Sequence, residues 1–448
     1  MLKIGFEQLY YKLIILLFGV IYLQQVLVLN VGGSFKIYEF VAIILLGAFL
    51  IRGKNYIIYS KYSLLLFLFF IVATVPGTVY QYLTIDTLSG FYNHFSEARG
   101  SLRFNMYVAP LIVYVYYVIC WLVINSINGS RLIYKDRDWL IRLYVIIGTI
   151  VSVYSLYGFF FVRIMGFPDL VPDMVDYRNH RPDYELRTSG FSSEAGDFAF
   201  MMSWVIIYLM YYKRLFSRKK EVLLIIINGS SLILTFSTNL LAFLFAVGLT
   251  VFIFDSIQKK IKITLAISLL SLAAFYFIVN SGYYELFKYV FYEKATHLLE
   301  KPTTVSSTGS IRSYHIYMGL ELFNDYPLFG VGGGNSVFHL WKYDDLMAAQ
   351  LDGVKSGLIK VIAETGLFGS FFFYSFYIYL LVTLIKKRKS RDPIIKVGFI
   401  GVITTLLMQF SLYPTYSIYL WVNIAIVLNY LKFSSVRQEV TQAQIKYA

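Results

Sequence analysis

Arginine, histidine and glutamate side chains gather in two long polar connections of an otherwise apolar chain. The first connection covers residues 163–195, contains Arg181 and Arg187, and closes with Glu194 near its end. Guanidinium groups stay charged at any relevant pH and bind phosphate oxygens through two parallel hydrogen bonds. A solvated polar loop is one interpretation of this segment, and a binding site for an anionic lipid headgroup is the other.

The second connection covers residues 282–363 and contains a predicted helix from about residue 311 to residue 324. Arg312, His315 and Gly319 follow one another on it at i, i+3 and i+7, which places them on one helix face. The ordinary pKa of histidine, about 6.5, suits a general base. This helix therefore presents a permanent cation and a titratable ring on one face.

A glycine-rich run follows the predicted helix, with glycine at positions 330, 332, 333 and 334. Glycine permits positive φ and a close approach of the backbone to a ligand. The run lacks the strand–loop–helix setting and the Lys-Ser/Thr ending of a P-loop. Two interpretations stay open, a structural turn and a turn that contacts a substrate.

Lys355, Lys360 and Glu364 stand at the boundary of the next apolar run, and Arg103 precedes an earlier one. Long basic side chains at such boundaries commonly extend their charged ends to the interface, so snorkelling is the simplest interpretation of the two lysines. Arg103 is equally well explained as an anchor or as a phosphate ligand. No arrangement of the histidines has metal-ligand spacing, and the single Cys120 lies in an apolar run, so we expect no metal site.

The elements that must position these residues are membrane helices. The chain has 58% hydrophobic and 15% charged residues, far from a soluble composition. Its net charge of +14 does not indicate nucleic-acid binding, because the basic residues lie in short clusters between apolar runs. A spanning helix needs about 20 mostly apolar residues. Twelve runs are candidates, at about 13–30, 37–52, 62–79, 104–126, 139–162, 196–212, 221–237, 239–256, 263–281, 364–385, 395–412 and 416–431.

Every second connection between these runs carries a cluster of lysine and arginine, which is typical of the cytoplasmic side. We therefore expect both termini in the cytoplasm and the long connections 80–103, 163–195 and 282–363 on the outer side. The chain, residues 1–448, is then a single all-α polytopic membrane domain. Its membrane cores contain almost no ionisable residues, which argues against an ion-coupled carrier and places the chemistry at the outer surface.

Three segments of the outer connections resemble the bacterial O-antigen polymerase and ligase superfamily, and the Wzy-type polymerases in particular. They are RTSGFSSEAG from residue 187, SIRSYHIYMGLELFNDYPLFGVGGGN from residue 310, and VKSGLIKVIAETGLFG from residue 354. Their order and their placement on one side of the membrane carry the resemblance. Lys355 stands where the family, and its ligases especially, often has a histidine, and this difference favours a polymerase.

The resemblance implies a glycosyltransferase of GT-C-like architecture in the bacterial cytoplasmic (inner) membrane. It would transfer a growing glycan from undecaprenyl pyrophosphate to the non-reducing end of an incoming undecaprenyl-pyrophosphate-linked repeat unit, in O-antigen or capsule synthesis. The base for the acceptor hydroxyl would be Glu194 first and His315 second. The pyrophosphate ligands would be the basic residues Arg187, Arg312, Arg181, Arg103 and Lys355. No cofactor is implied, membrane lipid surrounds the protein, and a chain-length-determining copolymerase is the implied partner.

Three other functions stay open at this stage. A ligase would move finished glycan to a separate acceptor. A flippase for lipid-linked oligosaccharides also has about twelve helices, but the long third outer connection and the charge-poor membrane cores argue against it. A polytopic scaffold that only binds partners is the last alternative.

Overall fold

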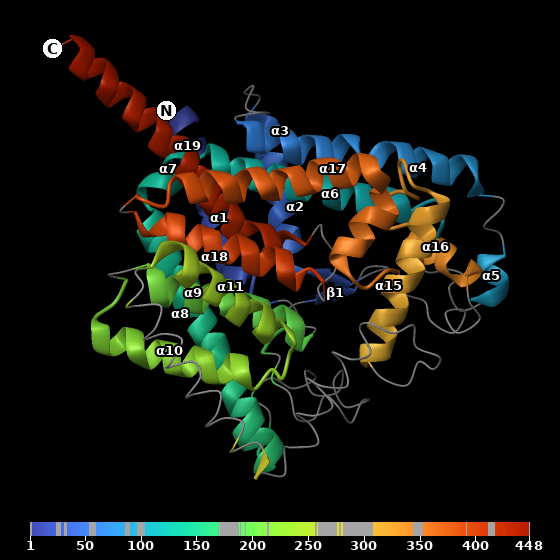
Figure 1. Cartoon of the computed structure of the whole chain (residues 1–448), viewed down its shortest axis with the longest axis horizontal. Helices are drawn as coiled ribbons and strands as arrows, with labels where there is room; N and C mark the ends of the chain where they lie inside the picture. Colours follow the sequence, from blue (N-terminus) through green and yellow to red (C-terminus); the bar gives the residue numbers. More distant parts are fainter. Residues whose placement is uncertain are drawn as a thin grey trace.

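The computed structural model shows a bundle of long helices (Figure 1). It describes residues 2–23, 28–30, 34–52, 60–85, 90–95, 104–168, 170, 188, 190–192, 194–212, 215–255, 258, 276, 279–280, 308–343, 353–390, 392–410 and 417–447. Strand pairing in this part of the chain is confined to a short antiparallel hairpin of β1 (Val28–Asn30) and β2 (Ser34–Lys36). The fold is otherwise helical there, as the apolar runs predict.

The helices of the described residues are α1 (Leu2–Val20), α2 (Ile37–Arg52), α3 (Lys61–Phe67), the π-helical η1 (Leu68–Val72), α4 (Thr74–Leu83), α5 (Phe91–His94), α6 (Ala109–Gly129), α7 (Arg131–Lys135), α8 (Arg137–Tyr157), the π-helical η5 (Gly158–Ile164), α9 (Ala195–Tyr211), α10 (Arg218–Ile233), α11 (Asn239–Phe254), α15 (Thr308–Asp325), α16 (Ser336–His339), the 3-10 helix η8 (Leu340–Lys342), α17 (Gly357–Lys386), α18 (Pro393–Met408) and α19 (Ile418–Tyr447).

Eleven of the twelve predicted runs overlap helices of the described chain, but the first, 13–30, was predicted to be too long at its end: α1 stops at Val20, and Val28–Asn30 form β1. The remaining run, residues 263–281, lies almost wholly outside the described residues. Four helical stretches of this part are long and apolar enough to cross a membrane, namely Lys61–Leu83, Ala109–Gly129, Arg137–Val162 and Gly357–Lys386. Several shorter apolar helices accompany them. The chain thus has the architecture of a polytopic membrane protein.

The structure locates two boundaries of the predicted membrane segments. Helices α10 and α11 are separate, and they meet at Leu234–Thr238, where the sequence offers only a short polar break. Helix α17 begins at Gly357, whereas the apolar run was predicted to begin at residue 364, because Lys360 and Glu364 lower the apparent hydropathy of its first turns; its backbone is interrupted at Gly366. The predicted start of this segment was therefore wrong by two turns.

Aromatic side chains fill the interior of the bundle. Trp421 of α19 contacts the rings of Phe70, Phe376 and Tyr377, with centroid distances of 5.3, 5.8 and 5.9 Å. Small residues permit close helix approach elsewhere, since a Cβ on Gly401 would lie 2.0 Å from the indole of Trp204. The helices therefore pack through matched large and small side chains, and buried hydrogen bonds also join them, as between the Tyr208 hydroxyl of α9 and Asn423 of α19 (3.1 Å).

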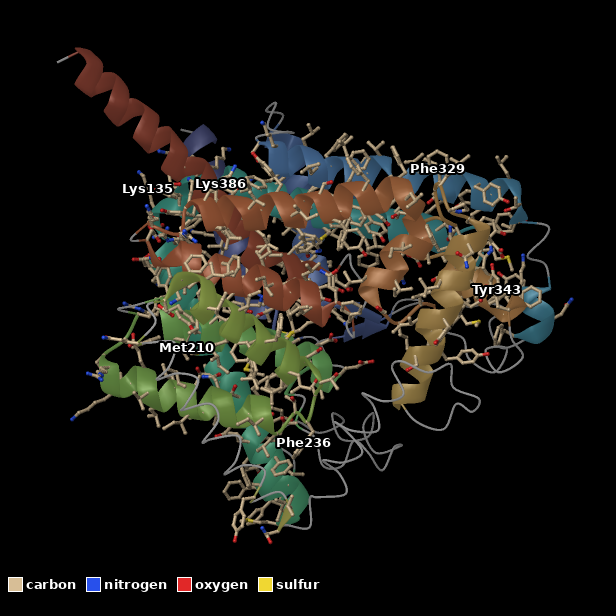
Figure 2. The ribbon with its side chains drawn as sticks, viewed as in Figure 1. Lys135, Met210, Phe236, Phe329, Tyr343 and Lys386 are labelled. Atoms are coloured by element: carbon tan, nitrogen blue, oxygen red, sulfur yellow. The ribbon has the colours of Figure 1, made fainter. Side chains whose placement is uncertain are left out.

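Polar contacts join the helix ends at one end of the bundle. Arg137 donates from Nε to the Tyr212 hydroxyl (2.8 Å) and from Nη2 to Asp392 (3.3 Å), and so connects α8 to α9 and to the start of α18. Figure 2 shows Lys135 and Lys386 at this end and Phe329 and Tyr343 at the opposite end. Figure 1 places both chain termini at the basic end.

Candidate active site

The structure describes only part of the predicted site. Arg103, Arg181 and Arg187 lie outside the described residues. The structure describes the backbone of Arg312, which belongs to α15, but not its side chain. The remaining predicted residues, Glu194, His315 and Lys355, are all described, and they belong to two groups of elements.

Helix α15 forms as the sequence predicts, and it lies against the first turns of α17. A Cβ on Gly319 would lie 2.6 Å from Ile359 and 3.2 Å from Val354, so the two elements touch at this glycine. His315 precedes Gly319 by four residues on the same face and is fully buried. The packed face of α15 is completed by an apolar cluster of Tyr314, Met318, Leu322, Val331, Leu340, Val354 and Ala363.

Helix α17 is broken at Gly366, whose backbone has φ 60° and ψ −162°. The glycine-rich run that follows α15 fills the break. Leu367 and Phe368 donate their backbone N–H groups to the carbonyls of Pro327 (2.8 Å) and Leu328 (3.1 Å). The carbonyls of residues 363 and 364 accept from the backbone N–H groups of residues 331 and 332 at 3.3 and 2.8 Å. Irregular backbone is tolerated near a membrane only where protein satisfies it in this way.

The glycines of the run are required by close contacts with backbone. Gly330 has φ 64°, and a Cβ there would lie 2.3 Å from the carbonyl carbon of Glu364. Gly332 has φ 92°, and a Cβ there would lie 2.6 Å from the backbone of Gly77 in α4. These close contacts explain why glycine is required at both positions. They favour the interpretation of the run as a structural turn over its interpretation as a turn that contacts a substrate.

Glu364 is the centre of the contacts around this turn. Its side chain is fully buried and accepts hydrogen bonds from the backbone N–H of Gly334 (2.8 Å) and the hydroxyl of Ser336 (2.7 Å). The ammonium group of Lys360, one helical turn earlier, lies 3.4 Å from the same carboxylate and is also buried. The snorkelling interpretation of Lys360 is therefore wrong, because the side chain points into the protein toward Glu364.

Ser336 links this carboxylate to the segment that carries Lys355. The Ser336 hydroxyl donates to Glu364 and accepts from the backbone N–H of Val354 at 3.3 Å. Val354 directly precedes Lys355, whose side chain is half-buried. Val354 and Lys355 therefore lie beside the buried face of α15.

A second buried contact lies beside the same turn. His339 of α16 and Gln81 of α4 are both buried, and His339 Nε2 lies 2.9 Å from Gln81 Oε1. The ring of Tyr326 packs edge-on against the imidazole, with centroids 5.4 Å apart. Burial, together with the nearby Lys342 ammonium group, lowers the pKa of His339 to about 3. The imidazole is therefore neutral at physiological pH.

Glu194 belongs to the other group, at the start of α9. It is exposed and has extended backbone, and the helix begins directly after it. In the first turn, Asp197 is buried and accepts a hydrogen bond from the Tyr419 hydroxyl of α19 at 2.6 Å. Asn239 of α11 donates to the carbonyl of Gly196 at 3.1 Å. Three helices thus fix the backbone next to Glu194 and leave its carboxylate accessible.

Sequence reasoning assigned no role in the site to four of these residues, although it placed Glu364 at the boundary of an apolar run. Gln81, Ser336 and His339 carry no spacing signal, because their partners are remote in sequence. Glu364 does stand in the third quoted segment, beside the glycine at which α17 breaks, and that pairing is the signal that could have identified it. Among the residues that the structure describes, no group of three or more His, Cys, Asp or Glu side chains could hold a metal ion.

Comparison with known proteins bears on the same elements. Residues 222–374 match the Wzy_C family model, described as O-antigen ligase. This match confirms the resemblance to the O-antigen polymerase and ligase superfamily. The matched Wzy_C segment begins in α10 and ends within α17, so it contains α15, the glycine-rich run and the break at Gly366. No curated protein matches the sequence.

Proposed function

We propose that this protein is a polysaccharide polymerase of the cytoplasmic membrane. It transfers a growing glycan from undecaprenyl pyrophosphate to the non-reducing end of an incoming lipid-linked repeat unit on the outer face. In this proposal about twelve helices span the membrane in a GT-C-like arrangement, and both termini are cytoplasmic. A chain-length-determining copolymerase is the expected partner.

The observation that carries the proposal is the Wzy_C match over residues 222–374. That segment includes the turn that packs into the broken helix α17, and Figure 2 shows Phe329 of this turn at the end of the molecule opposite Lys135 and Lys386. A polyprenyl pyrophosphate in the outer leaflet would reach this end. The match supports an enzyme of polysaccharide synthesis, and the polymerase is our choice within the superfamily.

Glycan transfer from undecaprenyl pyrophosphate needs positive charge beside the departing pyrophosphate and a base for the acceptor hydroxyl. The acceptor hydroxyl oxygen forms a bond to the anomeric carbon, while the bond from that carbon to the pyrophosphate oxygen breaks. Arg187, Arg312 and Lys355 would stabilise the negative charge that develops on the departing undecaprenyl pyrophosphate. Glu194, as an accessible carboxylate at the mouth of α9, would take the hydroxyl proton, with His315 as the second candidate.

A ligase is the second candidate, and a specific observation favours it. The matching family model is described as O-antigen ligase. In a ligase the same pyrophosphate would leave, but the accepting hydroxyl would belong to a separate molecule. Lys355, at the position where the superfamily's ligases often have a histidine, is our reason for preferring the polymerase.

Purified protein incubated with a lipid-linked repeat unit tests the proposal. A ladder of products of increasing length is expected from a polymerase, whereas transfer only to an added separate acceptor would replace our choice with a ligase. Arg187→Ala and Arg312→Ala should each reduce product strongly. Products of normal amount and length from both variants would contradict the assigned pyrophosphate site.

A further inference from the structure

Ser336 occupies a position at which one hydroxyl group serves two separate segments. A serine hydroxyl has one donor and two acceptor sites. Here the donor is used on Glu364 (2.7 Å) and one acceptor site on the backbone N–H of Val354 (3.3 Å). The side chain is fully buried, so water does not replace these bonds at its surface. Removal of this hydroxyl would uncouple α17 from the segment that precedes it.

The segment from residue 353 to residue 356 folds tightly around this hydroxyl. A Cβ on Gly353 would lie 2.8 Å from Ser336 Oγ and 3.8 Å from the ammonium nitrogen of Lys360. Val354 is fully buried and contacts α15 at Gly319, where a Cβ would lie 3.2 Å from its methyl groups. The position of Lys355 therefore depends on the preceding Val354, which is held by Ser336 on one side and by α15 on the other.

Glu364 is the fixed point of this arrangement. Its carboxylate is held by the backbone of Gly334, by Ser336 and by Lys360, and Glu364 lies two residues before the break in α17 at Gly366. Hydrogen bonds to a charged acceptor are stronger than those between neutral groups. The chain of contacts runs from Lys360 and Glu364 through the Ser336 hydroxyl to Val354 and Lys355.

We propose that Ser336 and Glu364 are positioning residues that hold Lys355 in place to bind the pyrophosphate of the lipid-linked substrate. The inference rests on the proposed function, because Lys355 is a pyrophosphate ligand only in that scheme. Neither residue touches the substrate. They act through the backbone at Val354, which couples the broken helix to the basic side chain at the site.

A first experiment measures the position of residue 355 without any need for activity. The single native cysteine, Cys120, is buried and is replaced by alanine, and a nitroxide label is attached to Lys355→Cys. Ser336→Ala should increase the mobility of the label in the electron paramagnetic resonance spectrum. Ser203→Ala is the matched control, because Ser203 is equally buried but its hydroxyl donates to the Ala199 carbonyl of its own helix.

An unchanged spectrum in Ser336→Ala would overturn the inference. If Ser336→Ala does not yield folded protein by size-exclusion chromatography, Glu364→Gln takes its place. Glutamine keeps the size of the side chain but has only one acceptor oxygen, so either the Gly334 N–H or the Ser336 hydroxyl loses its acceptor. The same increase in label mobility is expected, and an unchanged spectrum again contradicts the proposal.

A second experiment tests the effect on the reaction through a double-mutant cycle. Ser336→Ala should raise the KM for the lipid-linked repeat unit by roughly five- to tenfold, with a smaller change in kcat. In a Lys355→Ala background, Ser336→Ala should change KM little further, because the side chain through which Ser336 acts is already absent. Independent, additive effects on KM would overturn the positioning role. Absence of glycan transfer by the unsubstituted protein would instead contradict the proposed function, while the label measurement would still decide whether Ser336 holds residue 355.

Discussion

Gly77 of α4 and Gly332 of the glycine-rich run approach each other so closely that neither tolerates a side chain. A Cβ on Gly77 would lie 2.3 Å from the backbone nitrogen of Gly332. The helix before the first long outer connection is thereby fixed to the turn that fills the break in α17. This contact joins two parts of the chain that are about 250 residues apart in the numbering.

Gly77→Ala should therefore destabilise the protein, although alanine is a better helix former than glycine. We expect a loss of about 1–3 kcal/mol from overpacking, because the obstacle is backbone and cannot rotate away. Thermal unfolding in detergent provides the measurement. Gly47→Ala is the matched control in α2, since no described residue beyond its own helix turn lies within 4 Å of its Cβ position, and it should leave the unfolding temperature unchanged or raise it slightly. Equal effects of the two substitutions would contradict the close contact.

The buried ion pair of Lys360 and Glu364 gives a prediction about coupling. Lys360→Met leaves the carboxylate without its cation and should cost on the order of 3 kcal/mol. The double variant Lys360→Met/Glu364→Gln should be more stable than the single Lys360→Met variant, because no uncompensated charge is then buried. Thermal shifts of the single and double variants measure this. Lys219→Met, which removes an exposed lysine in the first turn of α10, should have no effect. A double variant less stable than both single variants would argue against the pairing.

His339 predicts a dependence of stability on pH. Its pKa in the folded protein is lowered to about 3, against about 6.5 in the unfolded chain. Between these values the unfolded state binds more protons, so stability is highest above pH 6.5 and falls as the pH decreases, by up to about 1.4 kcal/mol per pH unit from this group. His339→Gln removes the titrating ring but keeps hydrogen-bonding capacity toward Gln81. Its unfolding temperature should fall less between pH 7.5 and about pH 5, and parallel curves for both proteins would show that His339 is not buried as a neutral group.

The membrane helices could be predicted from sequence because hydropathy is a local property. Each apolar run carries its own signal, and the helix of residues 308–325 could be recognised from the residues within it. The start of α17 could not be located, since Lys360 and Glu364 look like interfacial residues until their mutual contact is known. Sequence places a charge on a helix but does not say what lies opposite it.

In the candidate site, too, some features could be predicted from the sequence and others could not. Its basic residues and Glu194 could be selected by residue type and by the three quoted segments. The bonds around Ser336 and the pairing of His339 with Gln81 join elements that come together only in the folded chain. The break at Gly366 belongs to the same class, because a glycine in an apolar helix is ordinary unless another segment supplies bonds to the interrupted backbone.

Glu194 provides the most direct test of the proposed chemistry. Its carboxylate is exposed at the start of α9, while the neighbouring Asp197 is buried against Tyr419. If Glu194 takes the proton of the acceptor hydroxyl, Glu194→Gln should lower kcat by about 10²–10⁴-fold with little change in KM, because glutamine has the same size but cannot accept the proton. The polymerisation assay with a lipid-linked repeat unit gives both constants. Glu221→Gln, which changes a glutamate at the start of α10, is the control and should retain activity. Normal turnover by Glu194→Gln would remove Glu194 from the reaction, and a large loss of kcat in His315→Gln would then assign the base to His315.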